Sequence, residues 1–151
     1  MFDTVVIATD GSESVARAVN VAADLANRFD ATVHALYVVD STEVDASPEG
    51  LKGDLHEALE RQGEDALETV REAAGGEVVT AVREGRPVVE ICEYARDHDV
   101  DVVATGTRGR HGENRLLLGS IAEGVVRTCP VPVLTVRQLE ESADAESAVG
   151  A

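Results

Sequence analysis

The sequence predicts an α/β fold in which one mostly parallel sheet carries helices on both faces. Five short apolar runs rich in β-branched residues alternate with stretches whose apolar residues recur every three or four positions. The first run, "TVVIAT" (4–9), is continuously apolar, as expected for a parallel strand that is buried on both faces. No internal repeat or second domain divides the 151 residues. We therefore expect a single doubly wound sheet with right-handed crossovers.

The first part of the chain predicts two strands that flank an amphipathic helix. "TVVIAT" (4–9) is the first strand, and the turn at 10–12 ends it, with Ser12 as the expected N-cap of the helix. "TVHALYVV" (32–39) is the second strand, and the polar stretch at 40–50 is expected to be a loop. The apolar stripe of the helix consists of Val15, Val19, Ala22, Ala26 and Phe29.

The rest of the chain continues the same alternation. Its predicted elements are a helix over 51–74, a strand over 77–85, a helix opened by Pro87, a strand over 100–106, a helix from Ser120 and a strand over 132–136. Gly75 and Gly76 are expected to end the long helix. Residues 1–137 form the expected domain, and the small, acidic residues 138–151 are expected to be a disordered tail.

The charge balance excludes several classes of partner. The chain has 29 Asp and Glu against 13 Lys and Arg, a net charge of −16. Nucleic acids and anionic membranes need a basic surface, so we expect neither as a partner. An acid-rich chain with a single lysine, Lys52, resembles halophilic proteins from a high-salt cytoplasm. Without a long uncharged apolar stretch or a basic leader, the chain is expected to be cytoplasmic.

Neither the cysteines nor the histidines form a metal or disulfide pattern. Cys92 and Cys129 lie far apart in apolar contexts and are expected to be small, buried side chains. The four histidines lack paired ligand spacing: His34, His56, His98 and His111. His111 lies beside Glu113 in a glycine-rich loop, where mobile side chains seldom build an organised catalytic site. We assign no metal ligand and no catalytic residue.

Two predicted strand ends carry the residues that stand out. Asp10 follows the first strand, and Gly106 opens a glycine-rich loop after the fourth strand. In open α/β sheets, ligands bind at the carboxyl ends of strands where the strand order reverses. If these strands are neighbours, Asp10 and Gly106 face the same crevice. Asp10 could instead be only a turn former or a helix cap, and that alternative stays open.

The loop after the fourth strand has features suited to a phosphate. Gly106 and Gly109 let the backbone approach a ligand and permit a positive φ, although simple turn formation is the alternative. Gly119 and Ser120 lead into a helix whose free amides and positive dipole end attract anions. The loop adds three cationic donors, which could instead pair with neighbouring acids: Arg108, Arg110 and Arg115. The spacing is neither a Walker A motif nor a dinucleotide fingerprint.

The spacing of Gly106, Gly109 and Gly119-Ser120 resembles the G-x2-G-x9-G-[S/T] signature of the universal stress protein family. The resemblance extends over about residues 2–137 and includes "VVIATDGSESVARAV", "ALYVVD", "LLLGSIAEGVVR" and "CPVPVLTVR". It implies a five-stranded parallel sheet in the order 3-2-1-4-5, a Rossmann-like fold similar to adenine nucleotide alpha hydrolases. It also implies homodimers that pair through the last strand. Together with the composition, it leads us to expect a haloarchaeal source.

The resemblance also implies the adenine end of an ATP site. Asp10 is expected to contact the ribose or adenine side of the nucleotide, and Ala8 and Thr9 are expected to line the adenine pocket. Val38 is expected to present its backbone to the adenine edge. Thr105 takes a place that a larger apolar residue often fills in the family.

At the phosphate end, the resemblance implies that Gly106, Arg108 and Gly109 wrap the ribose and phosphates. The helix N-terminus that holds the phosphates is expected to consist of Gly119, Ser120 and Ile121. Mg²⁺ is expected to accompany ATP.

The leading hypothesis is therefore an ATP-binding protein that senses or signals stress, with a protein partner that the sequence does not identify. A slow ATP hydrolase or phosphotransferase that uses the same loop is the alternative. That alternative lacks a well-placed general base near the expected γ-phosphate. An interaction protein without a ligand is a third possibility, which the intact glycine spacing disfavours.

Overall fold

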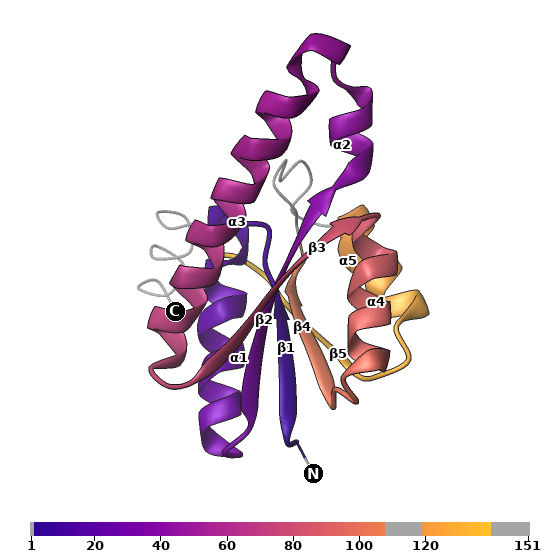
Figure 1. Cartoon of the computed structure of the whole chain (residues 1–151). Helices are drawn as coiled ribbons and strands as arrows, with labels where there is room; N and C mark the ends of the chain where they lie inside the picture. The colour runs from indigo at the N-terminus through magenta and orange to yellow at the C-terminus, as the bar shows by residue number, and fades with distance from the viewer. Residues whose placement is uncertain (1, 108–118, 140–151) are drawn as a thin grey trace, which may run out of the picture.

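The computed structural model describes residues 2–107 and 119–139. Its centre is a five-stranded, all-parallel sheet in the order β3-β2-β1-β4-β5, as Figure 1 shows. The strands are β1 (Thr4–Ala8), β2 (Thr32–Asp40), β3 (Val78–Gly85), β4 (Val102–Gly106) and β5 (Val133–Val136). The predicted fold class and the strand order that the family resemblance implied are confirmed.

Helices cover both faces of the sheet (Figure 1). On one face lie α1 (Ala16–Arg28), which follows the 3-10 turn η1 (Glu13–Val15), and α3 (Lys52–Ala74). On the other face lie α4 (Pro87–Asp97) and α5 (Ser120–Thr128). Each pair of helices packs its apolar stripe on the sheet and encloses a separate buried cluster.

The central strand β1 is buried on both faces, as its continuous apolar run predicts. Val5 and Ile7 belong to the cluster beneath α1 and α3, whereas Val6 and Ala8 belong to the cluster beneath α4 and α5. Because side chains alternate along a strand, one unbroken apolar run supplies both cores.

The strand order reverses beside β1. The chain builds β2 and β3 outward on one side of β1, and after α4 it returns to place β4 and then β5 on the other side. Ile7 of β1 therefore pairs with Ala35 of β2 and with Ala104 of β4. The carboxyl ends of β1 and β4 form the position at which ligands bind in open α/β sheets.

The prediction of a loop at 40–50 is wrong. Ser41–Ala46 form a short helix, α2, and Glu49–Leu51 form a 3-10 turn, η2. Asp40 caps α2, because its Oδ1 accepts hydrogen bonds from the Thr42 amide at 3.0 Å and the Thr42 hydroxyl at 2.6 Å. As Figure 1 shows, α2 and the first turns of α3 stand beyond the carboxyl ends of the strands.

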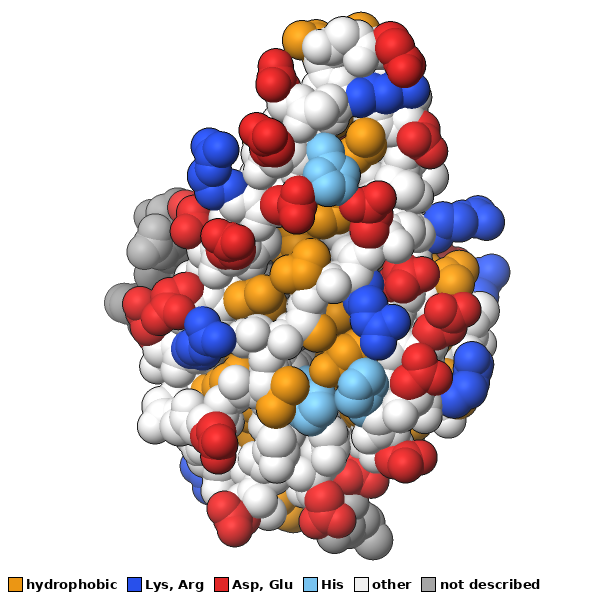
Figure 2. Space-filling view, in the orientation of Figure 1, with side chains coloured by type: hydrophobic (Ala, Val, Ile, Leu, Met, Phe, Trp, Pro, Cys, Tyr) orange, Lys and Arg blue, Asp and Glu red, His pale blue; other side chains and the backbone are white. Residues whose placement is uncertain are grey.

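The expectation that Phe29 belongs to the inward apolar stripe of the first helix is also wrong. Phe29 lies just after the last residue of α1 and is 52% exposed, with an edge-on contact to Phe2. The outer strand β3 is only half-buried, and Val79 and Val82 are exposed. Figure 2 shows an apolar band on this face of the molecule, with acidic side chains spread around it. Within the described ranges, no helix is long and apolar enough to cross a membrane.

Candidate functional site

The carboxyl ends of β1 and β4 gather most of the predicted site residues that the structure describes. Ala8 ends β1 and Thr9 follows it, while Thr105 and Gly106 end β4. Thr9 and Thr105 are the two polar side chains that are buried in the described part of the chain, with 7% and 8% exposed. Since buried polar groups are uncommon in an apolar core, their shared position at the sheet edge distinguishes this edge from the rest of the core.

The turn after β1 is held by its own side chains. Oδ1 of Asp10 accepts hydrogen bonds from the Ser12 amide at 2.9 Å and the Ser12 hydroxyl at 2.6 Å. The Gly11 amide donates to the Thr9 hydroxyl oxygen at 3.1 Å, and Gly11 has a φ of 78°, which favours glycine. The structure thus shows Asp10 as a turn former, and its contact with a ligand stays a prediction.

Ser12 takes the N-cap position, but it does not cap a helix with its side chain. It precedes η1, where no side-chain cap hydrogen bond is made, and α1 begins only at Ala16. The Ser12 hydroxyl orients the Asp10 carboxylate instead.

A side chain from α3 completes the turn, and no local sequence pattern predicts it. The Gln62 side-chain amide donates to the Asp10 carbonyl oxygen at 3.0 Å. Gln62 lies among polar residues of a long amphipathic helix, where nothing in its spacing separates it from solvent-facing neighbours. The contact joins α3 to the β1 turn, so the position of this turn depends on both elements.

A pocket of about 240 Å³ opens beside the turn, between α1 and α3. Its lining includes Thr9, Gly11, Ser12, Val15, Gln62 and Asp65. Small-molecule sites usually enclose about 300–1,000 Å³, so this pocket has room for part of a nucleotide rather than the whole.

At the other side of the crevice, the first and last parts of the glycine signature meet. The Gly119 amide donates a hydrogen bond of 2.6 Å to the carbonyl oxygen of Thr107, the residue after β4. Gly119 is the N-cap residue of α5 and makes no side-chain cap hydrogen bond. The exposed Ser120 and the half-buried Ile121 begin this nine-residue helix. The positive end of α5 therefore lies beside the end of β4.

The two signature glycines that the structure describes, Gly106 and Gly119, do not have a positive φ. Gly119 has a φ of −66°, and the described glycines with positive φ are Gly11, Gly75 and Gly85, not Gly106. Gly106 thus does not use the positive φ that glycine permits, and close backbone approach is the property that remains. Arg108 and Gly109 were also predicted, but they lie outside the described residues, as do Arg110 and Arg115.

Val38 lies on β2, beyond the end of β1. The pairing of β1 with β2 ends at Ala8 and Leu36, and the Thr9 amide then donates to the Leu36 carbonyl at 3.0 Å. Alternate residues of a strand present their backbone groups to the same side, so Val38 follows Leu36 on the side of β1. The register brings its backbone to the edge of the crevice, and its contact with adenine stays a prediction.

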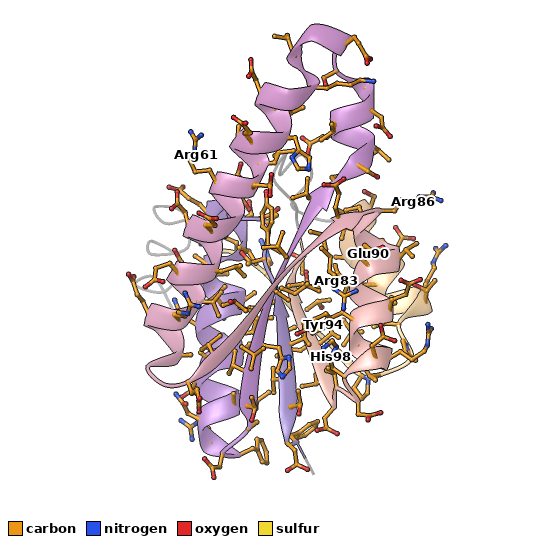
Figure 3. The ribbon with its side chains drawn as sticks, viewed as in Figure 1. Arg61, Arg83, Arg86, Glu90, Tyr94 and His98 are labelled. Atoms are coloured by element: carbon orange, nitrogen blue, oxygen red, sulfur yellow. The ribbon has the colours of Figure 1, made fainter. Side chains whose placement is uncertain are left out.

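A separate polar cluster lies under α4, toward the amino ends of the strands. His34 Nδ1 lies 2.7 Å from the Tyr94 hydroxyl, and the His98 ring stacks on the Tyr94 ring at 3.9 Å. The Arg83 guanidinium lies 5.2 Å from the same ring, on the side of β3 (Figure 3). Burial and the neighbouring His98 lower the pKa of His34, and burial raises the pKa of Tyr94. Tyr94 is buried, His34 is half-buried and His98 is exposed, and their ring contacts join α4 to β2.

The described residues offer no ready metal site. Nowhere in 2–107 or 119–139 do three or more His, Cys, Asp or Glu side chains gather in a way that could hold a metal ion.

A comparison with models of protein families shows to which family the chain is related. The model of the universal stress protein family matches residues 1–137. The chain belongs to the universal stress protein family. Universal stress protein MJ0531 of Methanocaldococcus jannaschii is 39% identical over 142 residues, which cover 91% of this chain and 84% of the relative.

Solved structures share the fold of this universal stress protein. The structure of the hypothetical protein MJ0577 is similar with a TM-score of 0.80 at 26% sequence identity. The matched region covers 93% of this chain and 99% of the MJ0577 chain. A universal stress protein in complex with cAMP has a TM-score of 0.69 at 24% identity and covers 91% of this chain and 98% of its own. At 24% identity, the second likeness shows the fold alone.

Proposed function

We propose that this universal stress protein binds an adenine nucleotide at the carboxyl ends of β1 and β4 and uses the bound nucleotide to sense or signal stress. The observation that carries the proposal is the contact between Gly119 and Thr107, which holds the uncapped N-terminus of α5 beside the strand-order reversal. Free helix amides and the positive dipole end form a phosphate site at that position.

The adenosine part of the ligand would lie over the ends of β1 and β2. The Val38 backbone lies at that edge, and the Asp10 carboxylate is already oriented by Ser12. A carboxylate that accepts from a ribose hydroxyl needs such a fixed orientation to contribute to affinity. A universal stress protein of the same fold was solved in complex with cAMP, which makes adenine nucleotides the first ligands to test.

Within this proposal, ATP with Mg²⁺ is the physiological ligand and hydrolysis is not the function. The described phosphate end offers backbone amides and the Ser120 hydroxyl. Glu123, in the first turn of α5, pairs with Arg127 at 2.5 Å and is therefore engaged away from a water molecule at the phosphates. A general base must lie within hydrogen-bonding reach of the water that it activates.

The proposal further includes a cytoplasmic homodimer that pairs through β5. An uncovered edge strand favours association, and β5 ends the sheet on one side. The opposite edge, β3, exposes Val82 and is the competing surface. Light scattering of Thr135→Lys and Val82→Lys distinguishes the two edges, because only Thr135→Lys is expected to yield monomers.

Calorimetric titration of the full chain with ATP, ADP, AMP, cAMP and GTP tests the nucleotide proposal. We expect adenine nucleotides to bind one site per chain and GTP to bind at least tenfold more weakly, a difference of about 1.4 kcal/mol. Gly119→Val, whose side chain would intrude on the phosphate position, is expected to abolish ATP binding while retaining the fold.

Gly76→Val is the matched control, because a side chain at Gly76 meets nothing within 4 Å. If the folded wild type binds no adenine nucleotide, the proposal fails. Equal ATP affinity in Gly119→Val and Gly76→Val would place the phosphates elsewhere.

A further inference from the structure

Residues 136–138, at the end of β5 and just after it, reach across to the first turn of α1. Oε1 of Gln138 accepts a hydrogen bond of 2.9 Å from the Arg17 backbone amide. The Arg17 guanidinium donates through Nη1 to the Arg137 carbonyl oxygen, also at 2.9 Å. In Figure 1 the yellow segment after β5 accordingly ends beside the start of α1. We call residues 136–138 the strap.

The strap caps α1, which has no cap in its own sequence. The first amides of a helix have no partner within the helix. Val15 takes the N-cap position of α1 and makes no side-chain cap hydrogen bond. Arg17 is the second residue of α1, and its amide is satisfied by Gln138, which lies 121 positions further along the chain. The start of α1 is therefore fixed by the end of β5.

The strap also joins the two ends of the proposed nucleotide site. At its beginning, the Val136 carbonyl oxygen accepts a hydrogen bond of 3.3 Å from the Thr107 amide, at the phosphate end. Its other end holds α1, which follows the Asp10 turn by way of η1. The pairing of β1 with β4 ends at Ile7 and Ala104, before either strand reaches the site. Beyond that point the strap connects the two ends.

We propose that Arg17 and Gln138 are positioning residues for the nucleotide site, which act by fixing the spacing between the β1 turn and the phosphate end. The inference rests on the proposed function, because it concerns the same site. A ligand that spans both ends binds more tightly when their spacing is already fixed, since binding then carries a smaller ordering cost. A ligand that contacts one end alone does not depend on this spacing.

The expected effect follows from the size of one exposed hydrogen bond. A neutral hydrogen bond changes an equilibrium constant by up to about tenfold. Gln138→Ala removes the acceptor for the Arg17 amide, and we expect it to weaken ATP about three- to tenfold. Adenosine and inorganic tripolyphosphate each reach one end of the site, so their affinities should change by less than about twofold.

A second set of variants tests the Arg17 side chain. Arg17→Met removes the donor to the Arg137 carbonyl and should weaken ATP as Gln138→Ala does, whereas Arg17→Lys keeps a donor and should restore most of the affinity. Arg28→Met is the matched control, because it changes the net charge of the same helix equally. Arg28 makes an exposed ion pair with Asp24, and such pairs contribute little, so this variant should bind ATP like the wild type.

Calorimetry on the folded full chain measures ATP directly and measures adenosine and tripolyphosphate by competition with ATP. Hydrogen exchange of the Arg17 amide, followed by nuclear magnetic resonance without nucleotide, examines the strap by itself. The exchange should be faster in Gln138→Ala by up to about tenfold and unchanged in Arg28→Met.

The three ligands separate positioning from other roles. Equal losses for all three in Gln138→Ala would indicate general destabilisation and overturn the inference. A loss for tripolyphosphate that matches the loss for ATP would make Arg17 or Gln138 a phosphate contact, which also overturns it. Faster exchange of the Arg17 amide with unchanged ATP affinity would show that the strap does not position the site. A wild type that binds no adenine nucleotide would instead overturn the proposed function, and the inference with it.

Discussion

Gly63→Ala tests the packing of α3 on the sheet. It should lower the stability of the protein, whereas the same substitution at an exposed glycine of α3 should raise it. A Cβ atom at Gly63 would lie 2.5 Å from Cδ1 and 2.8 Å from Cε1 of Tyr37, a ring that is fully buried on β2. Replacing glycine by alanine inside a helix normally stabilises it by about 1 kcal/mol. Overpacking a buried ring costs about 1–3 kcal/mol and more where the ring cannot move.

We expect the clash to dominate. The net loss should be about 2 kcal/mol in the free energy of unfolding, or about 4–8 °C in melting temperature for a chain of this length. Gly53→Ala is the matched control, because it lies in the same helix and its added methyl group meets nothing within 4 Å. That variant should be stabilised by up to about 1 kcal/mol.

Urea unfolding followed by circular dichroism, at one KCl concentration, measures both variants. A cycle with Tyr37→Leu separates the clash from other effects, because Gly63→Ala should cost less once the ring is removed. If Gly63→Ala and Gly53→Ala are equally stable, α3 does not approach β2 as described. A cycle without coupling would assign the loss to some cause other than the Tyr37 ring.

Three further predictions follow from charges and from the β1 turn. The hydrogen bond to Glu84, with the charges of Glu84 and Glu60, raises the pKa of His56. Protonated His56 therefore stabilises the fold fully below its unfolded pKa of 6.5. This contribution is lost as the pH rises through the raised pKa of the folded state. The stability difference between wild type and His56→Gln should shrink from about pH 6 to pH 9, and a pH-independent difference in urea unfolding would contradict the His56–Glu84 contact. The net charge of −16 causes repulsion within the folded chain, and salt screens this repulsion as the Debye length falls from about 30 Å at 0.01 M to about 3 Å at 1 M. The melting temperature should therefore rise with the KCl concentration. A melting temperature independent of KCl would contradict the halophilic interpretation. Asp10→Ala should weaken adenosine, AMP and ATP alike by roughly tenfold or more, since it acts at the ribose, and calorimetry showing a loss for ATP alone would move Asp10 to the phosphate end.

The sequence predicted the parts of the fold that depend on a strong apolar period. Buried strands such as β1 are unmistakable because both faces need apolar residues. The helix α2 was missed because none of its residues is buried, so it has no apolar stripe, and only the Asp40 cap marks its start. The half-buried β3 shows the same limit, since exposure at a sheet edge depends on the strand order and not on the composition of the strand.

Some residues of the candidate site could be predicted from a local sequence pattern, and others only from the packing. The structure brings Gly119 to the end of β4, where Gly106 lies, and the phosphate role that the family resemblance implies for both glycines stays a prediction. The contact of Gln62 with the turn after β1 could not be predicted, because it joins segments far apart in the chain without a spacing rule. It depends on how α3 packs beside this turn, which no local pattern shows.

Backbone rather than side chains should therefore determine nucleotide affinity at the phosphate end. The Gly119 amide is held by Thr107, and the following amides of α5 point out of an uncapped helix end, whereas Ser120 contributes one exposed hydroxyl. Ser120→Ala removes a neutral hydrogen bond worth about 0.5–1.5 kcal/mol and should weaken ATP by no more than about tenfold. Ser120→Pro is the informative partner, because proline fits the first position of a helix yet removes one amide donor without adding bulk beyond the turn. If the amides hold the phosphates, Ser120→Pro should weaken ATP clearly more than Ser120→Ala while leaving adenosine unaffected. Equal affinities for ATP in the two variants, measured by calorimetry, would show that side chains and not the α5 amides bind the phosphates.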